Sequence, residues 1–110
     1  GPYTFILEAS RLVPKIILPK RKTTGIRVPD NAICLALVRE LGEPVISSSV
    51  KNERDEFISD PRIIEEKFRH HVDLVIDGGI LALEPSSVIS LVEDQIEVIR
   101  TGKGDVTAFL

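Results

Sequence analysis

Short apolar segments follow one another along this chain in an order that limits the folds open to it. Runs rich in β-branched residues are typical of strands, and apolar residues that recur every three or four positions are typical of helices. The predicted strands are residues 3–9, 23–29, 44–49, 73–77, 86–92 and 95–100. Helices are predicted to begin at Asp30 and Asp60, and Gly42 should end the first. Strands that alternate with helices, followed by two strands together, predict a mixed α/β sheet.

Length and composition indicate a globular protein. The chain has 110 residues, 43% of them hydrophobic, which suits one domain or part of one and excludes a disordered chain. It has no apolar run near the ~20 residues of a membrane span, so we expect no membrane partner. The single cysteine, Cys34, cannot form a disulfide framework within the chain, which favours the cytoplasm. Because the sequence contains no methionine, we expect a fragment of a longer protein.

Charge is distributed unevenly along the sequence. Residues 1–29 contain six basic residues and one acid, whereas residues 30–110 contain sixteen acids and eight bases. The first stretch includes the run Lys20, Arg21 and Lys22. Such a run attracts RNA phosphates or forms an ordinary solvated loop, and the sequence leaves both readings open.

Polar residues gather where predicted strands end, and open α/β sheets often bind ligands at such places. Ser47, Ser48 and Ser49 end the strand at 44–49 and Lys51 follows it. Arg27 interrupts the strand at 23–29, and Arg100 ends the last strand. Hydroxyl groups and guanidinium forks suit phosphate and carboxylate oxygens. Turn-forming serines and structural ion pairs are the competing interpretation. No metal site is predicted, because the adjacent His70 and His71 would point to different faces of a helix.

Several ordered motifs together resemble the C-terminal half of the YrdC/YciO family. They are "GPYTFIL", "KTTGIRVPDNAICLALVRELGEPVISSS", "VDLVIDGG", "PSSVISL" and "VIRTGKGD", and the tail "GKGDVTAFL" resembles the YciO branch. The resemblance implies that residues 1–110 form the C-terminal part of one YrdC-like domain, without its N-terminal half. It implies a twisted, open mixed sheet with flanking helices around a positively charged cleft.

The best-known members of that family are threonylcarbamoyl-AMP synthases. The resemblance therefore implies a nucleotidyltransferase reaction in which threonine, bicarbonate and ATP give threonylcarbamoyl-AMP and pyrophosphate, with Mg²⁺, for modification of tRNA adenosine 37. In this chemistry a carbamate oxygen attacks the α-phosphate. The protein then positions anions and stabilises phosphoryl charge, so no catalytic nucleophile is expected.

The resemblance also assigns residues to substrates. Arg27 falls on an arginine expected at the carboxylate or carbamate of the substrate, and Arg100 on one expected at the α-phosphate. Ser49 and Ser86 fall on serines of family motifs expected to donate to the nucleotide. Thr4 has a weaker match to a substrate-contacting threonine. Arg27, Ser49, Ser86 and Arg100 are thus predicted to face one hollow.

One departure from the family pattern keeps other functions open. Lys51 stands where the family has an asparagine, and it binds phosphate there only as a point charge. A noncatalytic protein that binds tRNA or double-stranded RNA is therefore the main alternative, and a related carbamoyl-transfer domain is a third. We expect the chain alone to lack turnover and to associate with itself through its exposed apolar surface.

Overall fold

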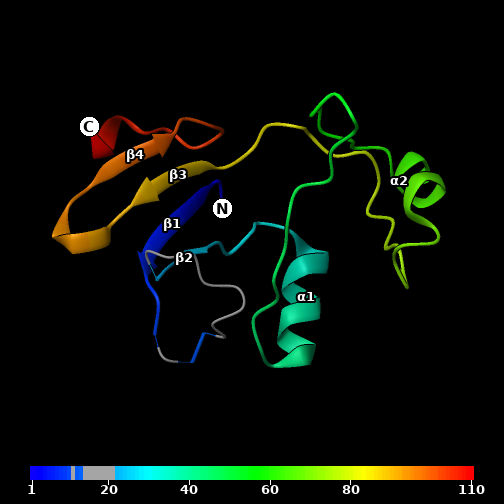
Figure 1. Cartoon of the computed structure of the whole chain (residues 1–110), viewed down its shortest axis with the longest axis horizontal. Helices are drawn as coiled ribbons and strands as arrows, with labels where there is room; N and C mark the ends of the chain where they lie inside the picture. The colour runs from blue at the N-terminus through cyan, green and yellow to red at the C-terminus, as the bar shows by residue number, and fades with distance from the viewer. Residues whose placement is uncertain (11, 14–21) are drawn as a thin grey trace. The chain divides into compact units, whose positions relative to one another are not determined.

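The computed structural model describes residues 1–10, 12–13 and 22–110. Contacts divide the chain into two compact units (Figure 1). The first, here called the sheet unit, comprises residues 1–35 and 84–110, and the second, the central segment, comprises residues 36–83. The elements are β1 Tyr3–Glu8, β2 Thr23–Ile26, α1 Ala32–Leu41, α2 Pro61–Phe68, β3 Ser87–Ser90, η2 Val92–Asp94, β4 Glu97–Arg100 and η3 Thr107–Phe109.

The sheet unit contains a mixed four-stranded sheet in the order β2-β1-β3-β4. Strand β1 pairs antiparallel with β2 and parallel with β3, and β3 pairs antiparallel with β4. Figure 1 shows β1 in blue between β2 and β3, although β1 and β3 come from opposite ends of the sequence. The predicted strands at 3–9, 23–29, 86–92 and 95–100 are confirmed with shorter bounds, and so is the mixed α/β (α+β) class.

Side chains alternate between the two faces of this sheet. Tyr3 and Phe5 stack with ring centroids 6.0 Å apart, and Phe109 contacts both rings edge-on at 5.8 and 6.2 Å. Ile89, which pairs with Phe5, is the fully buried hydrophobic residue of the described part of the chain. These residues make one face apolar, while Thr4 and Ile6 alternate with them and belong to the other.

Helix α1 begins later than the sequence predicts. Asn31, not Asp30, caps it, because the Asn31 Oδ1 atom accepts the Cys34 amide at 3.0 Å. An aspartate and an asparagine are almost equally good caps, so their order alone did not decide the start. The helix ends as predicted, with Gly42 at a φ of 75°.

The central segment lacks two predicted strands. Residues 44–49 and 73–77 form neither helix nor strand, and Ile46 and Leu74 are 75% and 76% exposed. Their composition favours β structure, but a strand requires a neighbour to pair with, and none of the described residues pairs with them. Both predictions are therefore wrong for this chain.

Helix α2 begins where the sequence predicts. Asp60 has extended backbone angles, and its side chain accepts the Arg62 amide at 3.0 Å, while Pro61 occupies the first turn. The apolar spacing of Ile64, Phe68 and Val72 predicts a helix that reaches Val72, but the helix ends at Phe68. No helix in the described ranges is long and apolar enough to cross a membrane.

Candidate functional site

Three of the predicted site residues meet in the sheet unit. Thr4 lies in β1, Ser86 immediately precedes β3, and Arg100 ends β4. The hydroxyls of Thr4 and Ser86 are 2.7 Å apart. Arg100 donates from Nε and Nη2 to the Ser86 carbonyl oxygen at 3.0 and 2.8 Å, and from Nη2 to the Ser86 hydroxyl at 3.3 Å. The sheet thus joins residues that are 82 positions apart in the sequence.

This trio combines a buried hydroxyl with an exposed cation. Ser86 is only 5% exposed, whereas the Arg100 side chain reaches solvent. No carboxylate within the described ranges forms an ion pair with Arg100. Its Nε and Nη2 are oriented by Ser86, which leaves the Nη1 donors available to an external acceptor. The group is therefore suited to an anion.

Strand register places the trio on the face opposite the aromatic residues. Thr4 pairs with Val88 across β1 and β3, and Val88 pairs with Arg100 across β3 and β4, so these residues share a face. Ser86 is two residues before Val88 and contacts both Thr4 and Arg100. Tyr3 and Phe5 flank Thr4 in β1 and therefore point the other way. The face opposite the aromatic residues thus carries this polar group beside the apolar Ile6 and Val88.

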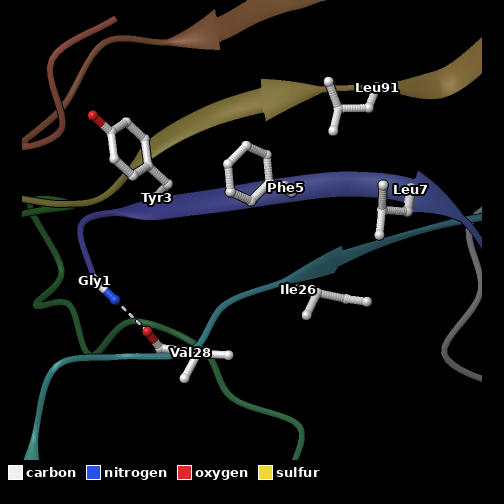
Figure 2. Close-up of a pocket in the computed structure, with 7 residues that line it drawn as sticks. All are labelled: Gly1, Tyr3, Phe5, Leu7, Ile26, Val28 and Leu91. Atoms are coloured by element: carbon white, nitrogen blue, oxygen red, sulfur yellow. Dashed lines mark hydrogen bonds between the residues drawn. The ribbon is translucent and has the colours of Figure 1, made fainter. Parts of the chain in front are cut away.

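Arg27 lies one residue beyond β2 and is exposed. Its Nε donates to the Gly1 carbonyl oxygen at 3.1 Å. Gly25, two residues earlier, faces Thr4, because a Cβ there would lie 3.3 Å from the Thr4 methyl group. Because side chains alternate between the two faces along a strand, Arg27 belongs to the same face as Gly25 and Thr4. No hydrogen bond between described residues joins Arg27 to the trio. The neighbouring Val28 carbonyl accepts from the Gly1 amine, as the dashed line in Figure 2 shows.

Ser49 and Lys51 belong to the central segment. Ser49 is exposed, while the Lys51 ammonium lies 3.1 Å from the Asp55 carboxylate and 5.0 Å from the centre of the Phe57 ring. The charge of Lys51 is therefore engaged locally. That Ser49 faces the same hollow as Ser86 and Arg100 stays a prediction.

The basic run at 20–22 lies largely outside the described residues. Lys20 and Arg21 are outside them, so their proposed RNA contacts stay predictions. Lys22 is described, is exposed and has a φ of 53°.

Ser87 has a role that the sequence analysis missed. It is 0% exposed, and its hydroxyl donates to the Gly104 carbonyl at 2.6 Å and accepts the Gly102 amide at 2.9 Å. The Lys103 amide also donates to the Pro85 carbonyl at 2.8 Å. These bonds hold the turn after β4 against the start of β3. Arg100 and Ser86 lie next to this contact in the sequence.

Two glycines let this turn approach its neighbours closely. A Cβ on Gly102 would lie 2.3 Å from the Pro85 carbonyl oxygen, and one on Gly104 would lie 2.5 Å from the Tyr3 ring. Any larger residue would push the turn away from β3. The Gly-x-Gly pattern at 102–104, next to a predicted strand end, was the available signal for this close approach.

The tail continues from this turn onto the aromatic residues. The Tyr3 hydroxyl donates to the Asp105 carbonyl oxygen at 2.8 Å. The Asp105 carboxylate accepts from the backbone amide and then the hydroxyl of Thr107, and these bonds hold its pKa below the usual value. Together they fix η3, which brings Phe109 onto Tyr3 and Phe5.

Comparisons with known proteins identify relatives over the whole chain. The family model Sua5_yciO_yrdC, described as "Telomere recombination", matches residues 1–102. The "Uncharacterized protein YciO" of Escherichia coli K12 is 47% identical over 112 residues, which cover 100% of this chain and 54% of that protein. The crystal structure of E. coli YciO has a TM-score of 0.92 and 46% identity over the same shares of the two chains.

A named enzyme is a more distant relative. The threonylcarbamoyl-AMP synthase of Chromobacterium violaceum is 33% identical over 92 residues, which cover 83% of this chain and 47% of that protein. The chain spans about half the length of the curated relatives it matches. This ratio agrees with the expectation of a partial domain, and the assignment of the chain to the C-terminal half stays a prediction.

Proposed function

Because the chain belongs to the Sua5/YciO/YrdC family, we propose that it supplies the phosphate-binding part of a threonylcarbamoyl-AMP synthase site. The reaction joins threonine, bicarbonate and ATP. A carbamate oxygen of N-carboxythreonine forms a bond to the α-phosphorus, the bond from that phosphorus to the bridging oxygen of the β-phosphate breaks, and pyrophosphate leaves. The whole protein would complete the site, and the chain alone would not turn over.

The observation that carries this proposal is the fastening of Arg100 to Ser86. Two bonds to the Ser86 carbonyl hold the guanidinium before any ligand arrives, and no hydrogen bond between described residues uses its Nη1 donors. A donor that is already oriented stabilises charge developing on a phosphoryl group without reorganisation. Arg100 would therefore contact the α-phosphate, with the hydroxyls of Ser86 and Thr4 beside it.

The other predicted residues take peripheral roles in this proposal. Arg27 is exposed on the β2 side of the same face and would contact the threonine carboxylate or the carbamate. Ser49 would donate to the nucleotide, and Lys51, already paired with Asp55, would contribute a more distant positive charge.

The residues present do not fit a Mg²⁺ ion held by the protein. Mg²⁺ prefers carboxylate oxygens and water, whereas the trio offers two hydroxyls and a guanidinium cation. Within the described ranges, no cluster of histidine, cysteine, aspartate and glutamate could hold a metal. Any Mg²⁺ in the reaction would arrive on the phosphates of ATP, and no step is assigned to it.

Pyrophosphate release by the full-length protein tests the proposal. Release should require threonine and bicarbonate together, and Arg100→Ala should lower kcat/KM by about 10²–10³-fold, the usual effect of losing one oriented donor. Arg69→Ala removes an exposed arginine next to α2 and serves as the matched control. Absence of release at high enzyme concentration, or equal activity of the two variants, would contradict the proposal.

Binding of tRNA or double-stranded RNA is the second candidate function. It is favoured by the exposed Lys22 and by the engagement of Lys51 with Asp55, which weakens the nucleotide interpretation at that position. Affinity for either RNA should fall steeply between 50 and 200 mM salt if phosphate contacts carry the binding. Salt-independent affinity, or none, would remove this candidate.

A further inference from the structure

The pairing of β4 with β3 shifts by one residue part of the way along. Ile89 lies opposite Val98, and the next pair is Val88 with Arg100. Strand β4 therefore has one residue more than β3 in this interval, which leaves Ile99 without a partner in β3. An extra residue of this kind is a β-bulge, and a bulge re-aims the side chains that follow it.

This bulge decides which face of the sheet carries Arg100. Val98 belongs to the face of the aromatic residues, because its partner Ile89 pairs with Phe5. Side chains two residues apart in a regular strand share a face, so without the bulge Arg100 would follow Val98 to that face. With the bulge, Arg100 belongs to the opposite face, where Thr4 lies.

The hydroxyl of Ser87 fastens the chain just beyond the bulge. It accepts the Gly102 amide at 2.9 Å and donates to the Gly104 carbonyl oxygen at 2.6 Å. Ser87 is fully buried, so water cannot take the place of either partner. These bonds fix residues 102–104 against the start of β3, directly after Arg100 and its neighbour.

The backbone of the turn keeps the same offset as the end of the strand. Lys103 lies three residues after Arg100. Its amide donates to the carbonyl of Pro85, three residues before Val88, at 2.8 Å. A slip of one residue would break this bond and the bonds of Ser87, and it would carry Arg100 to the aromatic face.

We propose that Ser87 is a positioning residue for Arg100. Its hydroxyl holds β4 in the shifted register, and that register presents the guanidinium to an anion on the face of Thr4. Ser87 itself is engaged with the turn and touches no substrate. The inference deepens the proposed function, on which its kinetic consequence rests, but the orientation of Arg100 is a property of the fold.

Exchange of the Arg100 Nε proton with water tests the inference in the full-length protein without any substrate. In the folded protein this proton is bonded to the Ser86 carbonyl oxygen. Ser87→Ala should raise the exchange rate, measured by NMR, about tenfold or more, because the register relaxes and the bond opens. Should this variant fail to fold, Ser87→Cys keeps a side chain of similar size with a weaker donor and should give a smaller rise.

Ser90→Ala is the matched control. Ser90 lies in the same strand, but its hydroxyl accepts the Val92 amide at 3.4 Å and has no bond to the turn after β4. This change should leave the exchange rate of the Arg100 proton as it is. Unchanged exchange in the Ser87 variants, or an equal rise in the Ser90 variant, would overturn the inference.

Pyrophosphate release connects the orientation of Arg100 to the reaction. Ser87→Ala should lower kcat/KM of the full-length protein by about 10–10²-fold, since a small displacement of a substrate-binding group has effects of that size. In an Arg100→Ala background the same change should add less than about twofold, because the group that it positions is gone. Equal losses in both backgrounds would overturn the inference. If the protein releases no pyrophosphate at all, the proposed function fails while proton exchange still decides the role of Ser87.

Discussion

The sheet unit and the central segment differ in how far apart in the sequence their hydrogen-bonded residues lie. In the sheet unit, backbone hydrogen bonds join distant residues: the Ser87 amide donates to the Pro2 carbonyl at 2.9 Å, and the Leu91 amide to the Ile6 carbonyl at 3.0 Å. In the central segment the bonds stay local, such as those from the Asn52 amide to Glu56 and from the Ile58 amide to Val50.

This difference teaches that apolar sequence becomes strand only where pairing is available. Segments 3–8 and 87–90 pair with each other and form strands, whereas 44–49 and 73–77 have similar composition and form none. Helix α2 needs only its own cap and first turn, and it forms in the same segment. Substitutions matched between the two regions, and a titration of α2 against β1, test this contrast.

Truncation of the buried isoleucine should have the largest effect. Ile89 is 0% exposed at the centre of the sheet, so Ile89→Ala should lower the free energy of unfolding by about 2–5 kcal/mol. Ile63→Ala in α2 is the counterpart, since Ile63 is 52% exposed and the change should stay within about 0.5 kcal/mol. Urea denaturation followed by circular dichroism measures both. Equal effects would show that the two regions do not differ in this way.

Removal of the buried hydroxyl should have an intermediate effect. Ser87→Ala leaves the Gly104 carbonyl and the Gly102 amide without their side-chain partner, which should cost about 1–3 kcal/mol. Ser47→Ala, at an exposed position of the central segment, should change stability little. The same denaturation experiment applies. A Ser87 variant as stable as the Ser47 variant would show that the turn after β4 does not depend on this hydroxyl.

Acid should produce the smallest and most local effect, at helix α2. Hydrogen bonds from the Arg62 side chain and backbone amide hold the pKa of Asp60 below its usual value. The stabilisation is therefore present above the unfolded pKa of about 3.9 and is lost as the pH falls through the lower folded pKa. NMR titration should show α2 amides following this transition while β1 amides do not.

Asp60→Asn is the control for that titration. Asparagine keeps a side-chain oxygen for the Arg62 amide but does not titrate, so the acid transition of the amides in the first turn of α2 should disappear while the helix remains. The last turn has its own acid-sensitive contact, because the hydrogen bond from Lys67 holds the pKa of Glu53 below its usual value. If the transition persists in this variant, Asp60 is not its source.

Local signals were sufficient for much of the fold. The Asp60-Pro61 start of α2 and the Gly42 end of α1 depend on single residues whose chemistry is visible in the sequence. Strands β3 and β4 are joined by a short connection in which Glu93 and Asp94 have φ values of 58° and 56°. The predicted strands at 86–92 and 95–100 leave these same two residues between them.

The remaining features depend on long-range contacts that no local pattern contains. The sequence indicated Ser86 and Arg100 separately. The two hydrogen bonds from the Arg100 guanidinium to the Ser86 carbonyl exist only because β4 ends beside the start of β3. The role of Ser87 escaped prediction for the same reason, since its partners lie 15 and 17 residues away. The strands predicted at 44–49 and 73–77 were wrong because composition does not show whether another strand is available for pairing.

The parallel pairing of β1 with β3 also has a consequence for folding. Thr4 and Ser86 are 82 residues apart, and closing a loop of that size costs about 4 kcal/mol in chain entropy. During synthesis β1 leaves the ribosome before β3 exists, so it cannot pair with β3 until the intervening residues have been made. The contact between Thr4 and Ser86 cannot form until this pairing has brought the two strands together.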